Sequence, residues 1–177
     1  PNNILLVDDY AFYDNNISTL DLSENIEIFG KSSFALNAIE TLKIPYSVKI
    51  IDDRAFQDNE IKTLNVANRV NTIGSSSFSN NNISELNILS KISTIKNNAF
   101  SNNLLQSVYF YQPFSDKFNA NIFQNNPTLN YLNLCGEDSS WLDEYFTNGN
   151  EFIEYKYNDC FFPDNSNIKQ YNFSEVI

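Results

Sequence analysis

A period of 22 residues runs through most of the chain and constrains its fold more than any other feature. Phenylalanine recurs at this interval and then once more after 23 residues, at Phe12, Phe34, Phe56, Phe78, Phe100 and Phe123. Asparagine follows each of them three residues later, at Asn15, Asn37, Asn59, Asn81, Asn103 and Asn126. A unit this short cannot bury its own apolar side chains, but similar units stacked in register cover one another. The repeat therefore predicts a solenoid of six coils, which we number by these phenylalanines.

Each unit also contains a short stretch in which apolar and polar residues alternate. In coil 1 it reads Leu20-Asp21-Leu22, which is the pattern of a strand with one buried face. Stacked copies should form a parallel sheet whose strands lie about 4.8 Å apart. The segment around each Phe has neither a helical nor a strand period, so we expect turns or 3₁₀ pieces there. Because that side is bulkier, the sheet should form the concave face.

The repeated asparagines are best explained as a structural ladder. The amide of each can bond backbone groups of its own coil and of the neighbouring coil, where a tight turn would otherwise bury them unpaired. A ligand-binding role is the alternative interpretation. We favour the ladder because a residue present in every coil serves what all coils share.

The repeats resemble a known family. The segments 53–66 and 99–105 look like the BspA-like leucine-rich repeats, whose pattern is roughly IgxxAFxxNxLxxVxIPxxVxxI, and the likeness covers about residues 4–134. The resemblance implies a right-handed leucine-rich-repeat solenoid of the α/β class. It also implies surface proteins that contact other proteins, and it does not imply catalysis. Asn stands where many members carry Cys, and only Ile44-Pro45 keeps the proline at the end of the strand.

Composition argues against several functions. The chain has no histidine, which excludes Ser-His-Asp and Cys-His nucleophile systems and every metal site that uses His. The net charge is −11, with 22 acidic and 11 basic residues among 177, so nucleic acid is not an expected partner. No apolar run approaches the roughly 18 residues of a membrane span. We therefore expect no enzyme, no cofactor and no metal. Methionine is absent even at position 1, and we expect a segment of a longer protein.

Two acidic pairs stand at the same position of coils 1 and 3. These pairs, Asp8/Asp9 and Asp52/Asp53, could serve as a metal or acid-base pair, but their place in the repeat favours a solvated face. The outward residues of the sheet are better candidates for function, because solenoids commonly present such a surface to partners. From these positions we select Tyr109, Tyr111, Tyr131, Glu85, Asn87, Lys43 and Asn133 as binding candidates. The tyrosines are equally compatible with burial under a cap.

The period stops after Leu134, and residues 135–177 are strongly acidic. A capping-box pattern from Ser140 predicts a short helix, and alternation over 153–157 predicts a strand. We interpret 1–134 as about six repeats and 135–177 as a C-terminal cap, because an open solenoid end normally needs a cover. Cys135 and Cys160 either form a disulfide that staples the cap to the last coil or are two unrelated thiols.

The leading hypothesis for function is a non-catalytic recognition module of a surface or secreted protein. It would bind another protein, such as a host surface or matrix component, through the concave face. The alternative is that the repeats carry a toxin or enzyme whose active part lies in 135–177 or outside this chain. A purely structural spacer is a third interpretation, favoured if no exposed tyrosine cluster exists.

Overall fold

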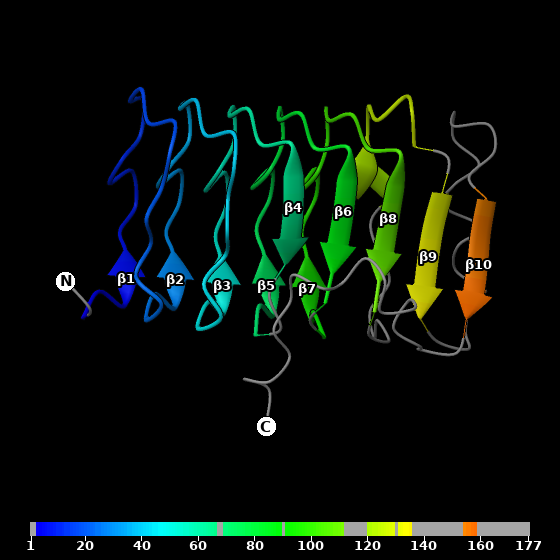
Figure 1. Cartoon of the computed structure of the whole chain (residues 1–177), viewed down its shortest axis with the longest axis horizontal. Coiled ribbons are helices and arrows are strands. Elements are labelled where there is room, and N and C mark those ends of the chain that lie inside the picture. The colour runs from blue at the N-terminus through cyan, green and yellow to red at the C-terminus, as the bar shows by residue number, and fades with distance from the viewer. Residues whose placement is uncertain are drawn as a thin grey trace.

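The coils are stacked along the longest axis of the molecule (Figure 1). The computed structural model describes residues 3–66, 69–89, 91–111, 120–129, 131–135 and 154–158. Its strands belong to two parallel sheets that run along the stack and point in opposite directions in Figure 1. We call them the long-strand sheet and the short-strand sheet.

The long-strand sheet forms where the sequence predicts strands. Its order is β10-β9-β8-β6-β4 and every pairing is parallel. The strands are β4 (Thr63–Val66), β6 (Glu85–Ile88), β8 (Ser107–Phe110), β9 (Tyr131–Cys135) and β10 (Glu154–Asn158). Leu64 lies opposite Leu86, which lies opposite Val108. The register therefore equals the sequence period, and the predicted parallel stack is confirmed.

The short-strand sheet was not predicted. Its members are two residues long, in the order β1 (Leu6–Val7), β2 (Ile28–Phe29), β3 (Ile50–Ile51), β5 (Thr72–Ile73) and β7 (Thr94–Ile95). In each pair the second residue is buried. Two residues are too few to show an alternation that identifies a strand from sequence.

The turns around the phenylalanines of coils 1 to 5 each use left-handed backbone at two positions, and the turn of coil 6 uses it at Asn125. In coil 3 these are Arg54 and Asp58, with φ of 59° and 55°. The turn directs the N–H groups of Arg54, Phe56 and Asp58 to carbonyl oxygens of coil 4, at 2.9, 2.8 and 3.1 Å. Left-handed backbone costs a residue with a side chain about 1 kcal/mol. The inter-coil hydrogen bonds keep it in place.

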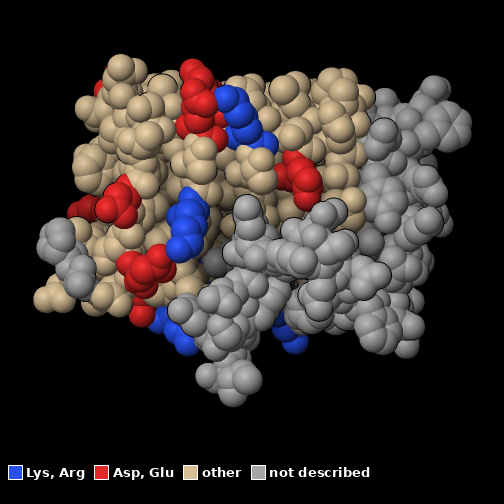
Figure 2. All heavy atoms as spheres, viewed as in Figure 1, with Lys and Arg blue, Asp and Glu red and all other residues tan. Residues whose placement is uncertain are grey.

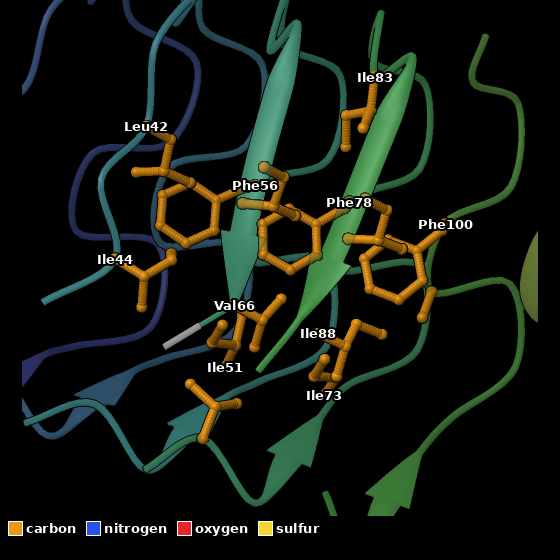
Figure 3. Packing of buried hydrophobic residues seen from close by; sticks show 14 of the residues in the cluster. Leu42, Ile44, Ile51, Phe56, Val66, Ile73, Phe78, Ile83, Ile88 and Phe100 are labelled. Atoms are coloured by element: carbon orange, nitrogen blue, oxygen red, sulfur yellow. The ribbon is translucent and has the colours of Figure 1, made fainter. Parts of the chain in front are cut away.

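The phenylalanines form one column inside the stack. Rings of successive coils are stacked with centroids 5.0 to 6.0 Å apart, from Phe12 to Phe123. Between Phe56, Phe78 and Phe100 the ring planes differ by only 2° to 3°. Figure 3 shows these rings surrounded by the aliphatic residues of both sheets. The column that the period predicts is confirmed.

Two features of the predicted fold need correction. The described residues contain no α-helix, and their one helix is the 3₁₀ helix η1 (Ala120–Phe123), so the stack is a β-solenoid and the α/β label is not supported. Coil 1 also forms no long strand, and coil 2 contributes only a bridge from Thr41 to Thr63. In coil 4 the Leu89 N–H donates to Val66 O of coil 3. Pro45 stands at the equivalent position of coil 2 and has no N–H, so coil 2 cannot form this hydrogen bond.

Strand β10 adds a segment from beyond the regular repeats to the sheet. It pairs in parallel with β9 along its whole length, from Glu154 opposite Tyr131 to Asn158 opposite Cys135, and so covers the edge that β9 would otherwise expose. The helix expected near 140–146 lies outside the described residues. The division into repeats and cap, and the concave curvature of the sheet, stay predictions.

We expect Ser77→Ala to stabilise the chain. The Ser77 hydroxyl is completely buried and has no hydrogen-bond partner, whereas coils 3 and 5 carry Ala55 and Ala99 at the same place. Removing an unpaired buried hydroxyl should raise the free energy of unfolding by about 1 kcal/mol, as measured by urea titration. Ser79→Ala is the matched control. The Ser79 hydroxyl donates to Ser76 O at 3.1 Å, and a gain in that variant as well would contradict this explanation.

Candidate recognition face

The alternation of the long strands separates core residues from surface residues. Along β4 and β6 the second and fourth residues are buried, while the first residue is exposed and the third is half-buried. The third positions bring Asn65, Asn87 and Tyr109 into one row, because the strands pair in register. We call the outward side chains of β4, β6 and β8, together with Tyr111, the recognition face.

Asn87 is the centre of this face. Its Nδ2 donates to Asn65 Oδ1 at 3.1 Å and to Glu85 Oε1 at 2.9 Å, and its Oδ1 accepts from the Tyr111 hydroxyl at 3.3 Å. The rings of Tyr109 and Tyr111 are stacked with centroids 6.3 Å apart. The network joins coils 3, 4 and 5, and it orients an amide, a carboxylate and two aromatic rings on one surface.

The remaining candidates are placed unevenly. Lys43 lies on coil 2 and forms an ion pair with Glu24, with Nζ 3.2 Å from Oε1. Both side chains are more than half exposed, so the pair adds little stability. Tyr131 and Asn133 lie in β9, opposite Ser107 and Tyr109 of β8. Their backbone register continues the rows of the face, but their side chains lie outside the described residues.

The repeated asparagines bind the coils to one another. Asn81 Nδ2 donates to the carbonyl oxygens of Phe56, Phe78 and Ser79 at 3.0, 3.2 and 3.3 Å. Its Oδ1 accepts from Ile61 N–H at 3.0 Å. The same set of bonds occurs at Asn37, Asn59, Asn103 and Asn126. Both the nitrogen and the oxygen of this amide therefore form hydrogen bonds inside the fold.

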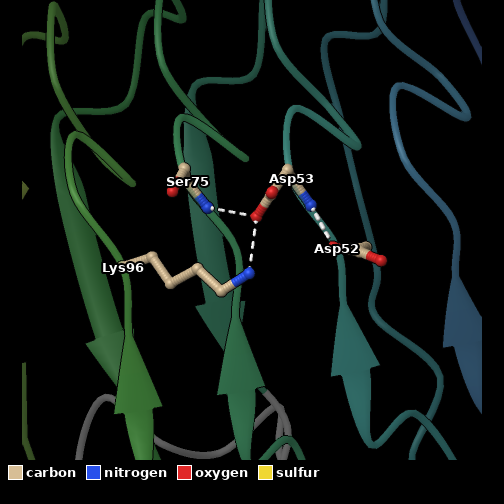
Figure 4. A network of polar contacts seen from close by, with 4 residues as sticks. All are labelled: Asp52, Asp53, Ser75 and Lys96. Carbon is tan, nitrogen blue, oxygen red and sulfur yellow. Dashed lines mark hydrogen bonds and ion pairs between the residues drawn. The ribbon is translucent and has the colours of Figure 1, made fainter.

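The second carboxylate of each acidic pair bonds to a later coil, and the first accepts a hydrogen bond within the pair. Asp53 Oδ1 accepts from Ser75 N–H and from Lys96 Nζ, both at 2.9 Å, and Asp52 Oδ1 accepts from Asp53 N–H at 2.7 Å (Figure 4). In coil 1, Asp9 and Asp8 make the equivalent bonds to backbone N–H groups. The pairs thus have structural partners, which sequence alone did not indicate.

A glycine in the next coil makes room for each acidic pair. A Cβ on Gly74 would lie 2.4 Å from the carbonyl carbon of Asp52 and 2.4 Å from the nitrogen of Asp53. The corresponding distances from Gly30 to Asp9 are 2.7 Å for Oδ1 and 2.8 Å for the nitrogen. Only glycine permits backbones to approach so closely. Acidic pairs and glycines therefore alternate along the first four coils.

We predict that Lys96→Gln raises the pKa of Asp53. Burial raises this pKa, but the Lys96 and Ser75 hydrogen bonds and the charges of Lys96 and Lys31 outweigh it, so the pKa lies below the usual value. The stabilisation from Asp53 is therefore complete above the unfolded pKa, about 3.9, and is lost as pH falls through the lower folded pKa. A carboxyl ¹³C NMR titration measures the value. An unchanged Asp53 midpoint in Lys96→Gln, or an equal rise in the distant Lys43→Gln control, would contradict the assignment.

Oppositely charged residues of neighbouring coils pair along the stack. Lys49 Nζ lies 2.8 Å from Glu27 Oε1, and Lys62 Nζ lies 2.6 Å from Glu40 Oε2. The Lys62 hydrogen bond and charge lower the pKa of Glu40, and Glu40 raises the pKa of Lys62. Figure 2 shows acidic and basic side chains next to one another among mostly uncharged surface. These pairs use the 22-residue offset and favour one register.

The described residues contain no cluster of three or more His, Cys, Asp or Glu able to hold a metal ion. In the same part of the chain, no helix has the length and apolar character to cross a membrane. The proposed pairing of Cys135 with Cys160 lies outside the described residues, because the side chain of Cys135 and all of Cys160 are among those not described.

Sequence reasoning missed Asn65 as a member of the recognition face. Its side chain accepts a hydrogen bond from Asn87 across adjacent strands. The signal was available, since Asn65 and Asn87 are one period apart at the same outward position. The bond from Tyr111 to Asn87 had no such signal, because Tyr111 follows the end of β8 and its ring direction depends on packing.

The comparisons with known proteins agree with the repeat architecture. A family model described as the BspA type leucine-rich repeat region, with six copies, matches residues 1–82 and 28–153. A search of curated proteins and a search of solved structures each gave no match. The matched ranges together cover more than half of the sequence. The chain therefore belongs to the BspA-type leucine-rich repeat family.

Proposed function

We propose that this chain is a non-catalytic module that recognises another protein through the recognition face. Membership of a leucine-rich repeat family supports a protein-interaction repeat module. The observation that carries the more specific proposal is the network around Asn87, which holds polar and aromatic side chains of adjacent coils in place. Side chains that are ordered before binding lose less entropy when a partner arrives.

The composition of the face suits a protein partner. Tyrosine is enriched among the residues that dominate binding energy at interfaces, because its ring is large, rigid and polar at one end. Tyr109 and Tyr111 are half-buried and stacked, while Glu85 and Asn87 supply polar groups beside them. We propose Tyr131, Asn133 and Lys43 as further contacts at the two ends of this surface.

We propose a surface or secreted location, with a host surface or matrix component as the partner. The family is typical of surface proteins, and this supports the location at the level of the family alone. The partner class follows from the same argument. Binding should not require a metal or a cofactor.

The test is capture of proteins from host-cell surface and matrix extracts with the immobilised 177-residue chain. For a captured protein, the double variant Tyr109→Ala/Tyr111→Ala should weaken binding by more than about 2 kcal/mol, or roughly 30-fold in Kd. The expected loss is large because the two rings supply most of the aromatic area of the described face. Isothermal titration measures the Kd.

The matched control is Thr72→Ala/Thr94→Ala, which changes two residues of the short-strand sheet. This variant should bind like the parent chain. Both variants must first give the parent circular dichroism spectrum. Equal binding by the tyrosine variant, or capture by residues 135–177 alone, would contradict the proposal and favour an active C-terminal segment.

A further inference from the structure

The N-terminal end of the stack holds most of the large apolar side chains that are exposed among the described residues. Phe12 is 44% exposed, whereas its counterpart Phe56 is fully buried. The other large apolar side chains exposed at this end are Ile4, Leu5, Leu6, Tyr10 and Tyr13. Phe12 stacks on Phe34 through one face of its ring, so its other face has no ring against it in the described chain.

Several polar groups of coil 1 at this end of the stack lack hydrogen-bond partners in the described chain. In the described chain the carbonyl oxygens of Asp9 and Ala11 accept no hydrogen bond, and Asp8 N–H donates none. The Asn15 amide donates only to Tyr13 O at 3.0 Å, and its Oδ1 accepts nothing. In coils 2 to 5 the equivalent groups bond to the coil before.

Coil 3 shows what would complete them, because it repeats coil 1 at the residues that matter. Both coils read Asp-Asp-x-Ala-Phe-x-Asp-Asn, at 8–15 and at 52–59. Coil 3 sits on coil 2, which has Gly30 and the run Ser32-Ser33-Phe34. Coil 4 has the same features, so two kinds of coil alternate along the first four.

The contacts between coils 2 and 3 supply each missing partner. Ser32 and Phe34 donate their N–H groups to Asp53 O and Ala55 O, at 3.0 and 2.8 Å. Phe29 O accepts from Asp52 N–H at 2.9 Å. The Asn59 amide donates to Phe34 O and accepts from Ile39 N–H, at 2.9 and 3.1 Å. The Phe34 ring lies 5.4 Å from the Phe56 ring.

We propose that the exposed end of coil 1 is a docking surface for one more coil of the Gly-x-Ser-Ser-Phe kind, joined directly ahead of residue 1. The occupant is specified by an aromatic ring over Phe12, by N–H donors to Asp9 and Ala11, and by a carbonyl and an N–H for the amide of Asn15. The surface continues an interface that the chain already forms between coils 2 and 3. Each described coil packs on the residues directly before it, which favours the same polypeptide as the source.

The test adds a copy of residues 23–44 directly ahead of Pro1, which keeps the 22-residue period. The extended chain should melt at least about 3 °C higher, since one added coil supplies several bonds and a ring contact. Amide hydrogen exchange at Leu6 and Val7 should slow by at least about tenfold. The control carries Phe34→Ser in the added copy only, and it should lose most of both gains.

A second variant distinguishes docking from a general effect of length. Asn15→Ala should hardly change the melting temperature of the parent chain, but it should lower that of the extended chain by several degrees, because its amide then bridges two coils. Equal effects in the two chains, or unchanged exchange at Leu6 and Val7, would overturn the proposal. Protection of β1 by concentration-dependent dimerisation of the parent would also overturn it, since the occupant would be a second copy.

Discussion

Asn81→Ala is expected to lower the free energy of unfolding by about 3 kcal/mol or more. The substitution leaves Ile61 N–H without a partner inside the stack, and a buried orphan group costs about 1 to 3 kcal/mol. The carbonyl oxygen of Phe56 loses its shorter hydrogen bond and keeps only the one from Asn59 Nδ2, at 3.3 Å. The carbonyl oxygens of Phe78 and Ser79 lose a donor as well. Urea unfolding followed by circular dichroism measures the loss.

Asn15→Ala is the matched control for this prediction. Asn15 stands at the same repeat position, but its amide makes one bond, to Tyr13 O within its own coil, and it is exposed. The expected loss is about 0.5 kcal/mol or less, the usual range for a surface substitution. Equal losses in the two variants would show that the amide acts through local turn propensity and does not bridge coils.

Phe78→Ala should cost about 3 to 5 kcal/mol, as is usual when a fully buried aromatic ring is removed from a core. The ring lies between those of Phe56 and Phe100, at centroid distances of 5.6 and 5.5 Å, and none of it is exposed. The neighbouring coils are held at fixed spacing by inter-coil hydrogen bonds on both sides of the ring, so the cavity cannot close easily. Thermal and urea unfolding both report the loss.

Phe12→Ala is the control for the column. Phe12 contacts one ring of the column, at 5.0 Å, and 44% of it is exposed. The Phe12 side chain buries less apolar surface on folding than the Phe78 side chain does. We therefore expect its removal to lower the free energy of unfolding by about 1 to 2 kcal/mol. A Phe12 loss as large as that of Phe78 would contradict the burial difference between the end coil and the inner coils.

The long-range order of the fold could be predicted because it follows from one period. A residue every 22 positions must meet its own counterpart when the coils are in register, so the ring column and the pairing of Leu64 with Leu86 follow directly. The outward row of Asn65 and Asn87 follows for the same reason. The period does not determine the curvature of the stack. The α/β label came from the family resemblance and not from the period, and it is not supported.

Features that depend on local backbone could not be predicted. Six of the eleven left-handed positions among the described residues hold Asp or Asn, which adopt that conformation most readily after Gly. The others include Tyr10, Leu36 and Arg54, which have no such preference, so the sequence does not mark the full set. The structural use of Asp53 depends on the close approach of Gly74, which the sequence shows only as an isolated glycine. Within the candidate site, the bond from Tyr111 to Asn87 depends on where a side chain turns after its strand ends.

The most direct test of the account is a crystal structure of the 177-residue chain. We expect one uninterrupted column of phenylalanine rings from Phe12 to Phe123, with centroid distances of 5.0 to 6.0 Å and an asparagine amide bridging each pair of coils beside it. Rings divided among separate clusters, or turned toward solvent, would contradict it. The recognition face would then lose the register that brings Asn65, Asn87 and Tyr111 together.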